Sequence, residues 1–201
     1  MLNIYKDIKK EREDACNNWH AFWRLTIAII FRSAIMVCLR VFFPLYLIAF
    51  FHHSSAEAAL ALTIFGLSGI VGNILGGMLA DRFGYALLVK ASAAAMVPLL
   101  VVFPFLHNVF LIYLDLMAIA LLLYASYSPI VVLGQKYLAR NEGFSAGITL
   151  GLSISVGGLF SPLLGFLADA YGLPIVFHAF GFFGLMGALC SLFLPNVSGK
   201  K

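Results

Sequence analysis

The sequence predicts an all-α polytopic membrane protein, with six transmembrane helices arranged as two three-helix repeats of inverted orientation. Two observations predict this fold class. The chain is 62% hydrophobic and only 11% charged, whereas soluble domains are about 45–50% apolar and about 25% charged. The motif Gly77–Gly84 also returns as Gly165–Gly172, at the end of the corresponding apolar run. Because three spans reverse the direction of a chain, a repeat of three spans is inverted relative to the bilayer.

Six apolar runs are long enough to cross the hydrocarbon layer, which takes about 20 helical residues. They are 25–50, 58–80, 86–106, 109–133, 146–168 and 173–194. Helices are expected because the strands of a membrane barrel alternate in apolarity, and these runs do not. Residues 25–196 therefore form one domain. The polar segment 1–24 is predicted to be a cytoplasmic linker or amphipathic segment, and 197–201 a cytoplasmic tail.

The basic residues predict the orientation. Of thirteen Lys and Arg, all except Arg32 and Arg40 fall on one side of the predicted bilayer. By the positive-inside rule both termini are cytoplasmic, as in a multi-pass protein of the inner (plasma) membrane. The formal net charge of +4 follows from this topology, and no nucleic-acid partner is expected.

The cysteines and motifs predict neither a metal nor a cofactor. Cys16, Cys38 and Cys190 do not have the spacing of a metal site. Disulfides are not expected either, because one cysteine is cytoplasmic and two lie within spans. No nucleotide-binding motif is present, which excludes an ATP-driven pump.

The first copy of the repeated motif contains Gly77, Asp81, Arg82 and Gly84. Gly77 leaves room for a close neighbour on its face, and Gly84 suits the left-handed cap that ends a helix. Asp81 is at a helix C-terminus, where an anion is disfavoured. It needs donors, predicted to be Arg82, Lys90 or the first N–H groups of the third span, and such a carboxylate can act as a latch.

The second copy keeps Gly165, Asp169 and Gly172, but Ala170 stands in place of the arginine. This difference is expected if the second loop faces outside. A single copy could be an ordinary polar turn, but the repetition favours a functional motif.

Small residues recur every four positions in two spans. They are Ser68, Gly72, Gly76 and Ala80 in the second span, and Gly143, Gly147, Gly151 and Ser155 in the fifth. Such seams let helix backbones approach closely in lipid. Static packing is one interpretation, and sliding of one repeat against the other is the alternative.

Two arginines lie inside the first span, where each costs about 2.5–3.5 kcal/mol unless it faces protein or water. Thr26, Arg32, Ser33 and Arg40 fall within about 120° on a helical wheel, which predicts one polar stripe. Asp115 in the fourth span lies at a depth close to that of Arg40. We expect Arg40 and Asp115 to pair across a cavity, either as a structural ion pair or with Asp115 as the proton carrier.

The fourth span has a second polar face, formed by Tyr113, Tyr124 and Tyr127 nearly opposite Asp115. These tyrosines and Ser33 are candidates for contact with a substrate. The sequence leaves open which face of the span lines a cavity.

Several segments resemble the major facilitator superfamily, and in particular the second half of drug-efflux members of the fosmidomycin-resistance type. They are Arg32-Ser33, Phe43–Leu47, Gly76–Gly84, Gly143–Gly151, Gly165–Asp169 and Phe193–Asn196. The resemblance implies half of a twelve-span fold, with Asp81 and Arg82 at a cytoplasmic gate. Where the family often has two basic residues after the last glycine, this chain has Tyr85 and Ala86. The latch is therefore expected to be weaker, or to recruit Lys90.

The resemblance implies secondary transport rather than catalysis. We expect proton-coupled efflux of a drug or metabolite by alternating access. The partners would be the lipid bilayer, a small-molecule substrate with a proton, and a complementary six-helix half or a second copy of the chain.

Two alternatives remain. The chain could be a truncated membrane remnant or scaffold that does not transport. Gly66–Gly69 also matches the Gly-x-Ser-Gly motif of rhomboid intramembrane proteases, with Ser68 as nucleophile and His178 as base, but that motif is common in glycine-rich spans.

Overall fold

The computed structural model describes residues 17–195, so the predicted linker up to residue 16 and the tail 197–201 lie outside the described residues. The α-helices are α2 (Trp19–Phe51), α3 (Ser55–Phe83), α4 (Tyr85–Val102), α5 (Val109–Ala125), α6 (Tyr127–Tyr137), α7 (Glu142–Tyr171) and α8 (Pro174–Leu192). Short 3-10 helices occupy Phe103–Phe105 and Ala139–Asn141.

Six helical stretches of the described chain are long and apolar enough to cross a membrane, which confirms the predicted number. Their ends differ from the prediction. Helix α2 begins at Trp19 rather than at residue 25, because the Asn18 side chain accepts a hydrogen bond from the Ala21 N–H and caps it. The fourth stretch continues to Tyr137. Apolar runs thus underestimate helices that extend past the hydrocarbon layer.

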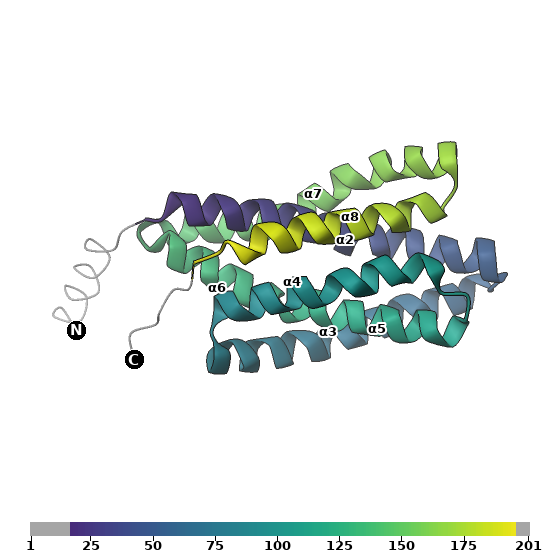
Figure 1. The fold of residues 1–201 in the computed structure, drawn as a ribbon, viewed down its shortest axis with the longest axis horizontal. Coiled ribbons are helices and arrows are strands. Elements are labelled where there is room, and N and C mark those ends of the chain that lie inside the picture. Colours follow the sequence, from purple (N-terminus) through teal and green to yellow (C-terminus); the bar gives the residue numbers. More distant parts are fainter. Residues whose placement is uncertain (1–16, 196–201) are drawn as a thin grey trace.

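The helices run back and forth in one elongated bundle (Figure 1). The described chain begins and ends at the same end of the bundle, which we call the termini end. The α3–α4 turn and the α6–α7 junction lie there as well. The connections α2–α3, α4–α5 and α7–α8 lie at the far end (Figure 1). Each three-span unit therefore starts where the other finishes.

The packing of the helices follows the predicted inverted repeat. Helix α2 packs most extensively on α7, and its counterpart α5 packs equally extensively on α3. Helix α2 also packs on α8, as α5 and α6 pack on α4, and α4 packs on α8. In the repeat, α2 corresponds to α5 and α6, α3 to α7, and α4 to α8. Exchanging these counterparts turns each packed pair into another packed pair or leaves it unchanged, as expected for a 3+3 arrangement.

The two glycine turns have the same backbone structure. Gly84 has φ 98° and ψ 142°, and Gly172 has φ 88° and ψ 160°. In each turn the glycine N–H donates to the alanine carbonyl four residues earlier, Ala80 or Ala168, at 2.8 Å. The positive φ confirms the need for glycine. The ψ values, however, differ from the predicted left-handed cap and belong to a region that is essentially restricted to glycine.

The fourth span is interrupted between α5 and α6, at Ser126. Pro129 follows three residues later. It has no N–H to donate to the Ala125 carbonyl, and its ring crowds that carbonyl, which breaks a helix.

The small-residue seam of α3 is a close helix contact. A Cβ built on Gly72 would lie 2.5 Å from the Leu121 carbonyl oxygen, and one on Gly76 would contact the Ala125 carbonyl still more closely. This confirms the predicted packing role for α3. The matching seam of α7 differs, because nothing lies within 4 Å of a Cβ built on Gly143, Gly147 or Gly151. That seam is open among the described residues.

The α3 seam gives a matched pair of substitutions. Gly76→Ala places a methyl group against the Ala125 carbonyl, and we expect it to lower the stability of the bundle by about 1–3 kcal/mol. Gly77→Ala meets nothing within 4 Å and should leave stability unchanged or raise it by up to about 1 kcal/mol, because alanine favours a helix more than glycine does. Thermal unfolding midpoints in detergent test this prediction, and equal midpoints for the two variants would contradict it.

Candidate functional site

Arg32 donates hydrogen bonds to two groups at the break in the fourth span. It projects from α2 and is only 6% exposed. Its Nε donates to the Ser126 hydroxyl at 3.0 Å, and its Nη2 donates to the Leu123 carbonyl. Its guanidinium also lies 5.4 Å from the centre of the Tyr127 ring. Hydrogen bonds from a charged group are strong, and they offset part of the cost of burying this charge.

A small internal cavity lies beside Arg32, between α2, α4, α5–α6 and α8. Its polar lining comes from Arg32, Ser92, Ser126 and Ser191, and its volume is about 20 Å³. This is room for about one water molecule, far below the roughly 300–1,000 Å³ of small-molecule sites. This cavity is therefore too small to hold a substrate.

The predicted polar stripe of α2 divides between different neighbours. Ser33 is completely buried and donates to the Ser153 carbonyl of α7 at 2.7 Å. Thr26 donates to the Phe22 carbonyl of its own helix at 2.9 Å. Ser33, predicted to contact a substrate, instead uses its hydroxyl in the α2–α7 interface.

Arg40 is exposed. At 3.6 residues per turn, it points about 80° from Arg32, which reaches α5 and α6. It points about 60° from Val37, which packs on Gly157 of α7. Arg40 therefore faces outward between the directions of α5–α6 and α7, on the side of α2 away from α8.

The predicted pair of Arg40 and Asp115 is not formed. Asp115 is 8% exposed and lies beside Leu99 and Val102 of α4. Its Oδ2 is buried without a hydrogen-bond partner among residues 17–195. The two residues are at similar depth, but Asp115 is on the α4 side of α5, whereas Arg40 points outward from α2.

The tyrosines of the fourth span face the other way. The Tyr113 ring packs on Phe43 of α2, with centroids 6.4 Å apart, and Tyr124 packs on Phe65 of α3 at 5.9 Å. Tyr127 lies under the Arg32 guanidinium. All three tyrosines are half-buried. The tyrosine face is thus directed toward α2 and α3, opposite the face that carries Asp115.

Tyr85 holds the carboxylate of the loop motif at the termini end. Its hydroxyl donates to Asp81 Oδ1 at 2.6 Å, and the Lys136 ammonium of α6 lies 4.4 Å from the centre of its ring. The sequence instead predicts Arg82, Lys90 or the first N–H groups of the third span as donors. Arg82 instead lies over the ring of its neighbour Phe83, at 5.5 Å. The aromatic residue that replaces a basic one in the motif is thus the partner of Asp81.

Gly77 of the first motif copy and the residues of the second copy make fewer contacts than Asp81 does. No atom lies within 4 Å of a Cβ built on Gly77, so the close neighbour predicted there is absent from the described chain. A Cβ built on Gly165 would lie 4.0 Å from the Phe42 ring. Asp169 is exposed, and the residue after Gly172 is Leu173, which has no hydroxyl to donate.

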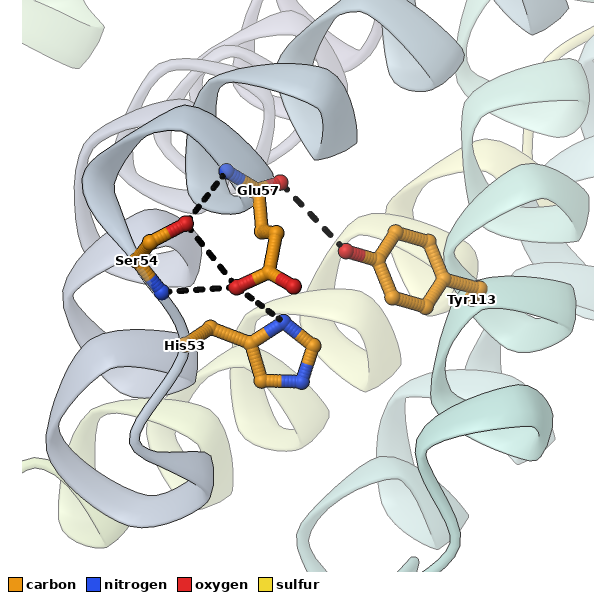
Figure 2. Close-up of polar contacts among 4 residues, drawn as sticks. All are labelled: His53, Ser54, Glu57 and Tyr113. Carbon is orange, nitrogen blue, oxygen red and sulfur yellow. Dashed lines mark hydrogen bonds and ion pairs between the residues drawn. The ribbon is translucent and has the colours of Figure 1, made fainter.

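A polar cluster joins helices at the far end (Figure 2). Ser54 caps α3, accepting from the Glu57 N–H at 3.3 Å, while the Glu57 carboxylate accepts from the Ser54 N–H at 2.7 Å. His53 Nδ1 lies 3.8 Å from the same carboxylate. The Tyr113 hydroxyl donates to the Glu57 carbonyl at 3.5 Å, which links α5 to the cap. The Ser-x-x-Glu capping pattern was the available sequence signal for this cluster.

Ser68 and His178 do not form a catalytic pair. Ser68 is buried on α3. His178 Nδ1 is 2.9 Å from the Pro174 carbonyl of its own helix α8, and its ring packs on Phe105.

Comparison with protein families identifies the class of protein. The family model described as Major Facilitator Superfamily matches residues 11–201. The chain therefore belongs to this superfamily and is a multi-pass membrane protein of a transporter family. This membership excludes the protease alternative.

Two curated relatives are similar over most of the chain. It is 36% identical over 155 residues to the uncharacterized MFS-type transporter YfnC of Bacillus subtilis (strain 168), a match that covers 77% of this chain and 37% of that protein. It is 27% identical over 174 residues to the fosmidomycin resistance protein of Escherichia coli (strain K12), covering 86% and 42%. The chain thus spans less than half the length of these relatives.

Solved structures show the same fold. The E. coli fucose:proton symporter FucP superposes with a TM-score of 0.71 at 21% identity, over 89% of this chain and 43% of that chain. FucP in the outward conformation gives the same values. The predicted fold class, six helices as half of a major-facilitator fold, is confirmed.

The different settings of the two intramembrane arginines predict different effects of the same substitution. Arg32→Lys removes the fork that reaches both Ser126 and Leu123, and should lower stability by about 1–3 kcal/mol. Arg40→Lys keeps an exposed charge and should change stability by less than about 0.5 kcal/mol. Thermal unfolding in detergent compares them, and a greater loss for Arg40→Lys would contradict this assignment.

Proposed function

We propose that this chain is the C-terminal six-helix half of a proton-coupled secondary transporter, which exports a small molecule by alternating access. The observation that carries the proposal is the difference between two turns of equal backbone structure at opposite ends of the bundle. At the termini end, Asp81 is held by Tyr85, and Lys136 packs on the same ring. At the far end, no residue between 17 and 195 donates such a bond to Asp169. A latch on one side alone suits a gate that opens the two sides in turn.

The termini end is the cytoplasmic side in this proposal, and the membrane is the inner (plasma) membrane. Arg82, Lys90, Lys136 and Arg140 are at this end, in keeping with the positive-inside rule. The Asp81 latch then belongs to a cytoplasmic gate, and Asp169 marks the outer copy.

The proposal requires a second six-helix unit, either a complementary half or another copy of this chain. The open seam of α7 supports this requirement, because Gly143, Gly147 and Gly151 present bare backbone to a neighbouring helix. Gly77 of the gate motif is also open. The relatives, whose length is more than twice the matched region, support a complementary half.

The substrate cavity is proposed between the two units, on the face that Arg40 and the tyrosines of the fourth span approach. Tyr113, Tyr124 and Tyr127 are half-buried there and suit an aromatic or apolar substrate. The efflux direction and a drug-like substrate rest on similarity to the fosmidomycin resistance protein. A remnant without transport activity is the alternative if no second unit exists.

The gate predicts a matched pair of tyrosine variants. Tyr85→Phe removes one solvent-exposed hydrogen bond to a carboxylate, worth about 0.5–1.5 kcal/mol, and should shift the gate equilibrium by about two- to tenfold. Tyr171→Phe alters an exposed tyrosine beside the second glycine turn and should have no effect. The measurement is transport by proteoliposomes that contain the chain and its complementary half.

Asp81→Asn should reproduce the transport defect of Tyr85→Phe. If both variants transported like the unmodified chain, the latch at Asp81 would not be a gate.

A further inference from the structure

A groove on the outside of the six-helix bundle contains Asp115. It runs between α4 and α5 near the far end and has a volume of about 290 Å³. Leu99 and Val102 line it from α4, Leu106 from the α4–α5 connection, and Leu111, Leu114 and Ala118 from α5. Val102, Leu111 and Leu114 are exposed. In a membrane, exposed apolar side chains of a span face lipid, so the groove opens to the acyl chains rather than to the proposed substrate cavity.

Of the residues that the structure describes, Asp115 is the one charged side chain that lines this groove. It is 8% exposed, and no hydrogen bond or ion pair joins it to another residue of the described range. An ionised carboxylate without a partner is costly in such surroundings. The groove therefore combines an apolar channel with an acceptor that nothing in residues 17–195 satisfies.

The depth of Asp115 suits the head of an amphiphile. It lies six residues from Val109, the first residue of α5, or about 9 Å along the helix axis. The start of α5 follows the short connection at the far end, where a span leaves the hydrocarbon layer. The carboxyl is thus just below the polar surface, and the leucines extend from it along the two helices.

From this geometry we infer that the α4–α5 groove binds a lipophilic ammonium ion that enters from the membrane, with its charged nitrogen on Asp115 and its hydrocarbon chain along the leucines. A protonated amine donates to the carboxylate in a charge-assisted hydrogen bond, and its chain fills the apolar groove. An uncharged amphiphile makes only the second contact. A phospholipid would bring a phosphate with its amine, and no basic side chain of the described range 17–195 lines the groove to receive it.

The test uses the full chain in phosphatidylcholine nanodiscs and the hydrophobic carbodiimide dicyclohexylcarbodiimide, which modifies carboxyls exposed to lipid. Adducts on each peptide are quantified by mass spectrometry. Asp115 should react, and Asp169, an exposed carboxyl at the same end, provides the comparison site. Asp115→Asn should abolish the adduct on its peptide and leave the adduct on Asp169 unchanged.

The ligands are N,N-dimethyldodecylamine, which is charged at neutral pH, and 1-dodecanol, which has the same chain without a charge. With the amine at about ten times its dissociation constant, labelling of Asp115 should slow about tenfold. The alcohol at the same mole fraction in the lipid should have little effect. Ala118→Phe, which fills the groove but keeps the carboxyl, should remove the protection by the amine.

Equal protection by the amine and the alcohol would overturn the inference, because it would show a groove that selects chain but not charge. Failure of the carbodiimide to label Asp115 at mildly acidic as well as neutral pH would also overturn it, because a protonated carboxyl that does not react is closed to the membrane. Binding is measured without substrate or gradient, so a failure here is distinguishable from a failure of transport.

Discussion

A helix break inside a hydrocarbon layer has to be repaired by side chains, since no water is available to the freed backbone groups. Pro129 imposes that break on the fourth span and lacks the N–H that would bond the Ala125 carbonyl. Arg32 donates to the Ser126 hydroxyl and the Leu123 carbonyl beside the break. These bonds join α2 to α5 and α6, the leading helices of the two repeats. Among residues 17–195, the partners of this buried arginine are a carbonyl, a hydroxyl and an aromatic ring, and its Nη1 has no hydrogen-bond partner.

The glycine seam of α3 is covered by a neighbouring helix, whereas the glycine seam of α7 is not covered within the described chain. Gly72 and Gly76 bring α3 into backbone contact with α5, so the two helices pack without intervening side chains. On α7 the equivalent residues meet nothing in the described chain, although α7 packs closely on α2 through another face, at Gly157. The two repeats are therefore alike in how they fold and different in which surface they leave uncovered.

The sequence predicted those features that depend on position along the chain. The number of spans, the inverted repeat and the positive φ of Gly84 all follow from apolar runs and from a repeated motif. The predicted pair of Arg40 and Asp115 failed because depth can be counted along a helix, whereas the neighbour on each face is decided by packing. Asp115 proved to face α4, and Ser33 proved to face α7.

The partner of Asp81 was missed for a chemical reason. Loss of the basic residues after Gly84 suggested a weaker latch, but Tyr85 brings a hydroxyl that donates to the same carboxylate. The contact of Lys136 with the Tyr85 ring joins residues far apart in the sequence, and no local pattern indicates it. Pro129, by contrast, is a local sequence signal for the interruption between α5 and α6, beside which Arg32 forms its hydrogen bonds.

The phenol at the Asp81 latch has a consequence for the response to salt. An exposed ion pair weakens as ionic strength rises, because mobile ions screen its charges over about 10 Å at 0.1 M. The Tyr85–Asp81 contact is a hydrogen bond between a neutral donor and a carboxylate, so screening removes little of it. A gate that closes through this bond would keep the same balance of open and closed states in dilute and in concentrated electrolyte.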